Sequence, residues 1–403
     1  MRKQNIWIIL ELFLVFIILW YIVDFFSVMG ITNTIPTGTD ITNVYRVIHT
    51  TKNRDSPKYI YYEWDKNESG RNFLRMLERL REHPEIESVC IGDYPYSLSH
   101  INRKYSRDSL MVNCRILTVS PEYFSMFNVT PLDGTDPEVL AKAIRKENSV
   151  ILSKKAKEDL FKDAPAVGQK IMYDKDSSMI NVSGVIGQMK MYEYERPIAH
   201  AIFLYNENDL LNNRYGFPDI CIKIKHGVSP IGFPERFKND MKQQLAIGNF
   251  FLADIVPLTK QREMYLRVSD ITTTLNYSIG ISIFFLINIF LGVLGIFWLR
   301  IEKRKPEIGI RMSMGSTKVQ IMRYMFTESM CLLGIASVPA ILVCINMAFM
   351  DIMPTENMDF TIIRFLSNTF ITYILLIMVI FLSTLYPARR SANIKPAEAL
   401  HYE

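Results

Sequence analysis

The sequence predicts a membrane protein with four transmembrane α-helices and a large α+β extracytoplasmic domain between helices 1 and 2. Three observations predict this fold class. Four apolar segments are each long enough to cross a hydrocarbon core, which takes about 20 helical residues. The stretch 29–270 between the first two segments has mixed polarity and contains no spanning run. Lys and Arg gather beside the segments on one side only, as they do in cytoplasmic loops.

The first apolar segment, 6–28, follows a short basic N-terminus, 1–5, that we expect to be cytoplasmic. A basic start before an apolar run is also typical of a signal peptide. However, Trp20 and Tyr21 stand where small residues should mark a cleavage site. We therefore predict an uncleaved membrane anchor. Glu11 inside the span indicates either a contact with another helix or a side chain that extends to the nearby interface.

The domain predicted over 29–270 begins and ends with a β-α-β pattern. Hydrophobic periodicity and turn residues predict strands at 41–51, 87–91, 110–119, 149–152, 168–173, 181–186, 201–205, 220–225 and 250–256, and helices at 68–83, 121–127, 154–161 and 234–245. The two outer units indicate a split ferredoxin-like subdomain. An inserted α+β subdomain is predicted between them, at about 120–215.

The rest of the chain completes the topology. A polar helical pattern at 259–274 leads directly into the second span, so one continuous helix is expected to enter the bilayer as a stiff rod. The predicted segments are the second span at 273–299, a basic cytoplasmic loop at 300–320, the third span at 321–350, a short acidic outer connection at 351–364, the fourth span at 365–386 and a cytoplasmic tail at 387–403.

The basic loop 300–320 is predicted to contain a short amphipathic helix. Pro306 can begin this helix, Glu307 is favourable in its first turn, Gly315 can end it, and Ser316–Thr317 can cap the next helix. Helical spacing places two groups on different sides, Ile308, Met312 and Gly315 on one and Glu307 and Arg311 on another. Such a helix suits docking in the groove of a partner protein. A helix lying on lipid headgroups is the alternative.

The composition argues against several function classes. The net charge of +5 is concentrated beside apolar segments, which indicates membrane topology rather than nucleic-acid binding. The sequence has no G-x-x-x-x-G-K-[ST], H-E-x-x-H or G-x-S-x-G motif, so we do not expect an enzyme, a cofactor or a metal in this chain. A cluster at His83, Glu85 and Glu87 is better explained by an exposed helix end than by a metal site. For Cys90 and Cys114, a disulfide and buried free thiols both remain open.

Two stretches carry a resemblance to a known family. KPEIGIRMSMGSTKVQI, at 305–321, resembles the E-I-G-x-R-x-x-x-G signature of the FtsX-like, MacB-type permeases of ABC transporters. The tail YPARRSANIKPAEALHYE resembles the ending P-A-R-x-A-x-x-x-P-x-E-A-L-x-x-E of the same family. TVSPEYFSMFNVTPLDG is similar, less specifically, to a phrase of the extracytoplasmic domain. The matches follow the family's order, and the resemblance covers essentially the whole chain.

The resemblance implies a permease subunit of the bacterial inner membrane that works with a separate cytoplasmic ATPase, which would bind ATP and Mg. It implies a homodimer, or a heterodimer with a sister permease. A periplasmic adaptor and membrane lipid are further candidate partners. ATP hydrolysis would drive a mechanical change in the outer domain, for efflux or extrusion of a periplasmic or membrane substrate.

The resemblance also assigns residues to roles. The residues expected at the ATPase contact are Glu307, Ile308, Gly309, Ile310, Arg311, Met314 and Gly315. The residues that match the tail signature, and that we expect to support the loop, are Pro387, Arg390, Pro396, Glu398 and Leu400.

Two alternatives come from other function classes. A membrane receptor or sensor with a ligand-binding outer domain would share the anchor and the domain, but it requires a cytoplasmic output domain or a signalling partner. A structural scaffold would leave the loop signature unexplained. A neighbouring gene for a phosphate-loop ATPase would favour the permease.

Overall fold

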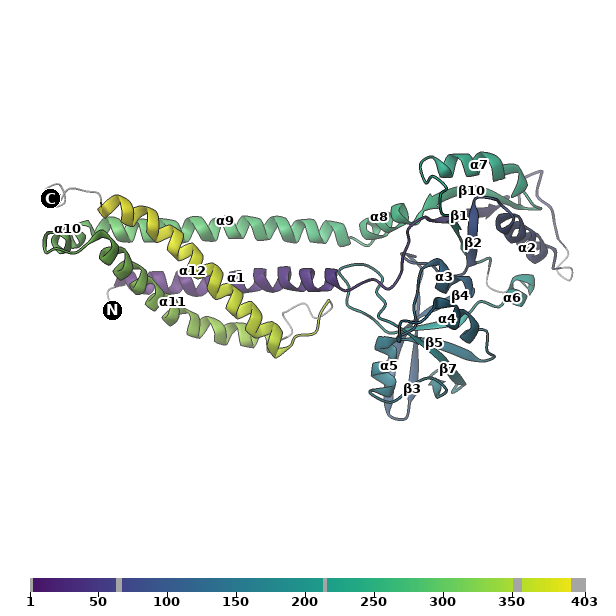
Figure 1. Ribbon diagram of the computed structural model, residues 1–403, viewed down its shortest axis with the longest axis horizontal. Coiled ribbons are helices and arrows are strands. Elements are labelled where there is room, and N and C mark those ends of the chain that lie inside the picture. Colours follow the sequence, from purple (N-terminus) through teal and green to yellow (C-terminus); the bar gives the residue numbers. More distant parts are fainter. Residues whose placement is uncertain (1–2, 63–66, 213–215, 351–356, 393–403) are drawn as a thin grey trace. The chain divides into compact units, whose positions relative to one another are not determined.

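The computed structural model describes residues 3–62, 67–212, 216–350 and 357–392 (Figure 1). The chain divides into two compact units. The first, here called the membrane unit, comprises Met1–Thr34 and Thr273–Glu403. The second, called the core domain, comprises Ile35–Thr272.

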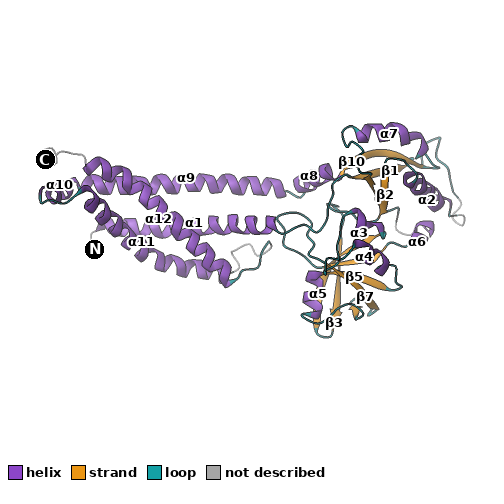
Figure 2. Cartoon of the chain, viewed as in Figure 1, coloured by secondary structure: helices purple, strands orange, loops and turns teal. Residues whose placement is uncertain are grey.

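In its described part the membrane unit consists of helices joined by short loops and contains no strand (Figure 2). Its helices are α1 Lys3–Thr34, α9 Ile271–Lys303, α10 Lys305–Ser313, α11 Lys318–Phe349 and α12 Ile362–Ala392. Four of them are long and apolar enough to cross a membrane, over Ile6–Thr34, Ile271–Ile296, Val319–Phe349 and Ile362–Ser383. The prediction of four transmembrane helices is confirmed, although α1 continues to Thr34 rather than ending at 28.

Helices α1, α11 and α12 share one apolar core, whereas α9 contributes little to it. The core includes Phe16 and Trp20 of α1, Ala336 of α11 and Leu376 of α12, all almost fully buried. In its most apolar window, α1 is 44% buried and α9 only 17%. Apolar side chains that face lipid tails need no protein cover. Helix α1 is therefore the central helix of the unit, and α9 lies at its periphery.

The core domain contains a four-stranded antiparallel sheet in the order β10-β1-β9-β2. Its elements are β1 Val44–Thr51, α2 Glu68–Arg81, β2 Ile86–Ile91, β9 Ile220–Ile224, α7 Phe233–Gln244 and β10 Phe250–Pro257. Two β-α-β units with this strand order form a ferredoxin-like fold, divided here between β2 and β9. One face of the sheet is covered by α2 and α7, which bury Phe73 and Phe237 against it. The split ferredoxin-like prediction is confirmed.

The segment between β2 and β9 forms a closed barrel in the order β3-β4-β8-β5-β7-β6. Its strands are β3 Ile101–Arg107, β4 Leu110–Val119, β5 Ser149–Ser153, β6 Lys170–Tyr173, β7 Met179–Ile186 and β8 His200–Leu204, and the helices among them are α3 Glu122–Met126, α4 Pro137–Ala143, α5 Lys154–Phe161 and α6 Glu207–Asn212. The insertion thus begins before β3, well ahead of the predicted position near 120. Strand β3 was missed because only Tyr105 and Ser106 of its seven residues are buried, so its sequence shows no apolar alternation.

The predicted continuous helix from 259 into the second span is wrong. Helix α8 runs over Leu258–Val268 and α9 begins at Ile271. Asp270 has φ +55, a left-handed conformation that Asp tolerates better than most residues. The N–H of Asp270 donates to the carbonyl of Arg267 at 3.1 Å, and the N–H of Ser269 donates to the carbonyl of Tyr265 at 2.9 Å. These two bonds close α8. The connection from the core domain to α9 therefore contains a turn rather than a rigid rod.

The cysteines of the core domain are free and buried in different clusters. Cys90 of β2 packs with Cys221 and the apolar residues beneath the sheet, whereas Cys114 lies inside the barrel. Of the two options that the sequence left open, the structure has buried thiols. Burial raises the pKa of both Cys90 and Cys114 to about 12, so little reactive thiolate is present at neutral pH.

Native protein is therefore expected to resist a maleimide at Cys90 and Cys114, and to react there only when unfolded in urea. The measurement is mass spectrometry of labelled peptides from the full chain. A Lys175→Cys variant, at an exposed turn, supplies the rate of an accessible thiol. Native-state labelling of Cys90 or Cys114 at that rate would contradict the structure.

Candidate coupling segment and a buried ion pair between helices

Residues 300–320, called the coupling segment, fold as the sequence predicts. Helix α9 ends at Lys303, and Arg304 breaks the helix with φ −102 and ψ 5. Helix α10 then begins with Pro306 and Glu307 in its first turn. Proline costs nothing there because the first N–H groups of a helix have no intrahelical acceptor.

Gly315 ends α10 with φ +94. The N–H of Ser316 bonds the carbonyl of Arg311 at 3.0 Å, and that of Gly315 bonds the carbonyl of Met312 at 3.0 Å. This pair of bonds is a Schellman motif, which favours glycine in the left-handed position. Thr317 then caps α11 in a reciprocal capping box with Gln320. The C-terminal end of α10 and the N-terminal end of α11 are thus fixed by local hydrogen bonds.

Replacing Gly315 by alanine is expected to destabilise this turn by about 1–2 kcal/mol, because a Cβ disfavours the left-handed conformation. The amides of residues 311–318 should then exchange with solvent roughly five- to thirty-fold faster. Hydrogen exchange of the full chain in nanodiscs measures this. Gly280→Ala, in the helical backbone of α9 with open space around the site, should leave exchange unchanged. Equal exchange in the Gly315→Ala and wild-type chains would show that the motif does not hold the turn.

One side of α10 packs onto α11. Ile308 is buried with Ile321 and Met325, and Met312 and Met322 border this small cluster. The predicted grouping of Ile308 with Met312 is confirmed, whereas Gly315 lies exposed in the turn. The packing means that α10 cannot tilt without moving the start of α11.

A second side of α10 carries a charged network. Arg311 donates to Glu307 at 3.1 Å and its guanidinium lies 4.5 Å from the ring centroid of Tyr324. Arg304 pairs with Glu328 of α11 and approaches Glu307 at 3.9 Å. Exposed ion pairs contribute little stability, so their main effect here is to orient the side chains. Arg304 nevertheless joins the end of α9 to α11.

The predicted contact residues separate into two groups by burial. Ile308 and Gly309 are buried against this chain, and Glu307 is half-buried. Ile310 is 51% exposed and Met314 81% exposed, and Arg311 and Gly315 are exposed beside them. The segment thus presents two apolar side chains and one cation to its surroundings. That these residues contact an ATPase remains a prediction.

The predicted tail motif lies at the edge of what the structure describes. Pro396, Glu398 and Leu400 fall outside the described residues. Pro387 and Arg390 belong to the last turns of α12, and their support for the loop remains a prediction.

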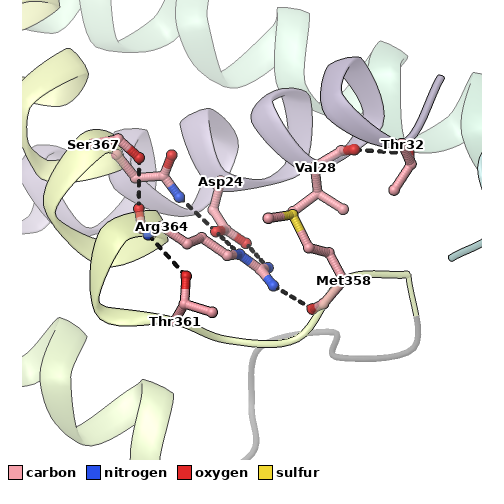
Figure 3. Close-up of polar contacts among 8 residues, drawn as sticks. Asp24, Val28, Thr32, Met358, Thr361, Arg364 and Ser367 are labelled. Atoms are coloured by element: carbon pink, nitrogen blue, oxygen red, sulfur yellow. Dashed lines mark hydrogen bonds and ion pairs between the residues drawn. The ribbon is translucent and has the colours of Figure 1, made fainter. Parts of the chain in front are cut away.

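The strongest polar site in the membrane unit was not predicted from the sequence. Arg364 of α12 lies against Asp24 of α1 (Figure 3). The guanidinium makes two bonds to the carboxylate, from Nε to Oδ1 at 2.7 Å and from Nη2 to Oδ2 at 2.6 Å. The Nδ2 group of Asn368 donates to the same Oδ1 at 2.6 Å. Both charged side chains are at most 2% exposed. We call Asp24, Arg364 and Asn368 the ion-pair cluster.

Further contacts hold α12 in place. Arg364 donates from Nη1 to the carbonyl of Met358 at 2.6 Å. Trp20 donates to the hydroxyl of Thr369 at 3.2 Å, and Tyr373 bonds Ser337 of α11. Helix α12 is therefore tied to α1 and to α11 by polar as well as apolar contacts. A charged residue inside an apolar span is the signal in the sequence that points to such a site, and the first span has this signal at Asp24 as well as at Glu11.

Glu11 itself lies at a contact between helices. A Cβ added to Gly292 of α9 would come within 3.1 Å of the Oε1 atom of Glu11. Of the two alternatives for this carboxylate, the structure supports the helix contact. Glycine at position 292 allows α9 to approach the central helix α1 there.

Comparisons with known proteins agree with this arrangement. Residues 23–230, just over half of the chain, match the model of the MacB-like periplasmic core domain. Residues 279–396 match the model of the FtsX-like permease C-terminal domain. The two matches cover most of the core domain and most of the helices α9 to α12, and leave residues 231–278 between them.

Individual relatives are distant. Macrolide export ATP-binding/permease protein MacB 1 of Yersinia pestis bv. Antiqua (strain Antiqua) is 24% identical over 298 residues, 72% of this chain and 44% of that protein. The MacB protein of Salmonella paratyphi A is 21% identical over 84% of this chain and 50% of that protein. The chain thus spans about half the length, or less, of these relatives.

Among solved structures, the periplasmic region of MacB from Actinobacillus actinomycetemcomitans matches 56% of this chain and 94% of that one, at 14% identity and a TM-score of 0.35. The extracellular domain of the noncanonic ABC-type transporter YknZ from Gram-positive bacteria matches 53% of this chain and all of that one, at 10% identity and a TM-score of 0.34. The family assignment rests on the two family models and not on these structures. The chain belongs to the family of FtsX-like, MacB-type permeases of ABC transporters.

Proposed function

We propose that this chain is a permease subunit that receives mechanical work from a separate cytoplasmic ATPase and passes it to its core domain. The observation that supports this proposal most directly is the geometry of the coupling segment. Helix α10 is short, closed at its C-terminal end by hydrogen bonds, and packed onto α11, while Ile310 on the helix and Met314 at its C-cap remain exposed. Two exposed apolar side chains on a rigid helix are suitable anchors for a groove in a partner.

The contacts within the segment explain how a push on α10 would spread. Ile308 links α10 to α11 through the apolar cluster, and Arg304 links the end of α9 to Glu328 of α11. Force applied at Ile310 or Met314 would therefore reach α9 and α11 together. ATP and Mg would be bound by the ATPase alone. Efflux or extrusion of a periplasmic or membrane substrate is the work that we propose for this motion.

The proposal extends to the assembly and its location. Two permease chains, identical or from sister genes, would pair with two ATPase subunits in the bacterial inner membrane, with both termini cytoplasmic. The large peripheral surface of α9, with exposed Phe284, Ile287 and Leu291, supports a helix partner or lipid on that side. A periplasmic adaptor is a further proposed partner of the core domain.

The test is co-purification of the full chain, in nanodiscs, with phosphate-loop ATPases encoded in the same genome. A variant with Ile310→Glu and Met314→Glu changes only exposed side chains of α10, so the fold and any dimer should be retained. Burying each new carboxylate in an apolar groove costs roughly 1–3 kcal/mol, so we expect at least a tenfold loss of affinity. Ile231→Glu with Val167→Glu places the same charges on exposed apolar positions of the core domain and should bind normally.

Three outcomes separate the hypotheses. Loss of the complex in the α10 variant alone supports the proposed contact. Normal binding of that variant would place the ATPase contact elsewhere on the chain. Absence of binding to every candidate ATPase would favour the receptor or sensor alternative.

A further inference from the structure

Residues 187–199 form the segment between β7 and β8. This segment contacts the first and the last part of the core domain along the chain, where the chain continues into the membrane unit. We call it the strap. One of these parts is the linker 35–41, which follows α1. The other is α8, which precedes α9. All the contacts described next lie within the core domain.

The strap and the linker meet backbone to backbone. The N–H of Lys190 donates to the carbonyl of Thr37 at 3.0 Å. Next to this bond, Gly38 has φ +83, and a Cβ there would lie 2.3 Å from the carbonyl oxygen of Gln188. Real Cβ atoms do not approach an oxygen so closely. The positive φ at position 38 also disfavours every residue that has a Cβ. Only glycine permits this contact without displacing the strap.

The strap and α8 are joined through a carboxylate. Glu193 accepts from Arg262 of α8, with 2.5 Å between Nε and Oε1, and from the hydroxyl of Tyr96 at 3.1 Å. Tyr96 has φ +64, a strained conformation for an aromatic residue. Its carbonyl accepts from the buried Gln261 of α8 at 3.4 Å. Two residues of α8 thus hold the strap and the Tyr96 turn.

One residue of the strap connects the two contacts. The backbone of Lys190 binds the linker, and its Nζ donates to the carbonyl of Glu193 at 2.7 Å. Lys190 is only 3% exposed, and burial lowers the pKa of its ammonium group. A second bond, from the N–H of Met191 to Oε2 of Glu195 at 2.8 Å, closes the strap on itself. The segment is therefore a compact, internally bonded loop rather than a loose connection.

We propose that the strap makes the linker, α8 and the barrel move as one body, so that displacement of either connection reaches the barrel. Glu193 is the positioning residue of this device. The inference rests on the proposed function for its use, because work arriving through α1 or α9 must enter the core domain at these two places. The coupling itself is a property of the core domain and can be measured without an ATPase.

The test is hydrogen exchange of the full chain in nanodiscs, read at the linker 35–41 and at α8. Glu193→Gln weakens a hydrogen bond to a charged group, which corresponds to about tenfold faster exchange in α8. If the strap couples its two contacts, the linker amides should also exchange several-fold faster in this variant. Gly38→Ala, made at the linker, should in turn accelerate exchange in α8, because energetic coupling between two sites is reciprocal.

Glu138→Gln is the matched control. It neutralises an exposed carboxylate that lies 4.0 Å from Lys142 on α4, and should change neither the linker nor α8. The proposal is overturned if each variant accelerates exchange only at its own contact. Arg262→Lys retains the positive charge and should fold even if Glu193→Gln does not. Faster exchange in α8 of this variant must also be accompanied by faster exchange of the linker amides.

A second measurement separates this inference from the proposed function. In a complex with the ATPase, Glu193→Gln should bind and hydrolyse ATP normally but should lose most of any ATP-dependent change of exchange in the barrel strands. If no ATPase binds, the proposed function fails while the reciprocal exchange in the free chain still decides the coupling. An unchanged ATP-dependent response in a working complex of the variant would show that the barrel is driven by another route.

Discussion

Replacing Arg364 by methionine is expected to lower the free energy of unfolding of the membrane unit by about 3–5 kcal/mol, the usual cost of removing one partner from a buried ion pair. Methionine fills much of the same volume and is apolar, so packing alone should change little. The cost arises because the carboxylate of Asp24, at most 1% exposed, would keep its charge without the guanidinium. The Nδ2 group of Asn368 would be its remaining bonded partner among the contacts of the ion-pair cluster.

The effect is measured as the temperature at which the chain in detergent ceases to be monodisperse. A double variant, Asp24→Asn with Arg364→Gln, replaces the ion pair by two neutral groups that can still bond. It should recover most of the loss, because neutral groups carry a smaller desolvation cost than an unpaired charge. Arg267→Met, at an exposed arginine of α8, should resemble the wild type. A single variant as stable as the wild type would show that Asp24 is not charged or that lipid headgroups or water reach it.

The reason that this cluster escaped prediction is physical. The distance along the chain from Asp24 to Arg364 is 340 residues, and only the packing of α12 against α1 brings them together. Sequence periodicity finds faces of single helices but not their partners. Arg364 was therefore interpreted as part of the outer connection 351–364. The observed start of α12 at Ile362 moves it into the helix.

The coupling segment could be predicted almost completely because its structure depends on local chemistry. Pro306, Gly315 and Thr317 each act on the backbone within a few residues, so the start, the end and the following cap were readable from the sequence. The Schellman bonds at Gly315 and the capping box at Thr317 are the hydrogen bonds that form the predicted helix end and the predicted cap. What the sequence did not show is burial, since Ile308 and Ile310 are equally apolar but only Ile308 faces α11.

The core domain shows the opposite case. The ferredoxin-like half could be predicted because α2 and the sheet strands have clear apolar periods. The barrel could not, because its closure depends on strands that pair far apart in sequence, such as β3 with β6 through Tyr105 and Tyr173. The break at Asp270 was missed for another reason. A single residue in the left-handed conformation interrupts the helix without any change in the polarity pattern on either side.

The core domain is expected to lose stability between pH 6.5 and 4 because of one histidine, His200. The side chain of His200, at the start of β8, is fully buried. Its Nδ1 lies 3.0 Å from the carbonyl of Ile198, which can only accept, so Nδ1 carries the proton and Nε2 is a bare acceptor. Burial lowers the pKa of His200 to about 4, the Ile198 carbonyl opposes this shift, and the positive charge of Arg115 adds to it.

The sign follows from proton binding. Between pH 6.5 and 4 the unfolded chain binds a proton at this histidine and the folded chain does not, so acid favours the unfolded state. The contribution is complete above pH 6.5 and disappears progressively as the pH falls towards 4. A change in pKa from 6.5 to about 4 corresponds to roughly 3 kcal/mol of unfolding free energy. Burial raises the pKa of Glu195, which acts in the opposite direction, so absolute slopes combine several groups.

A comparison between variants removes that complication. Urea-dependent hydrogen exchange of the β1 and β9 amides, in the full chain at pH 7 and pH 4.5, gives the change in unfolding free energy. His200→Gln should reduce this change by about 2–3 kcal/mol relative to the wild type, because glutamine cannot take up the proton. His226→Gln, at an exposed turn, should keep the wild-type change. Since Glu195 is present in all three chains, its effect cancels in the comparison. An equal pH dependence in wild type and His200→Gln would mean that the folded imidazole takes up its proton over the same pH range as the unfolded one, so that burial does not disfavour its charged form.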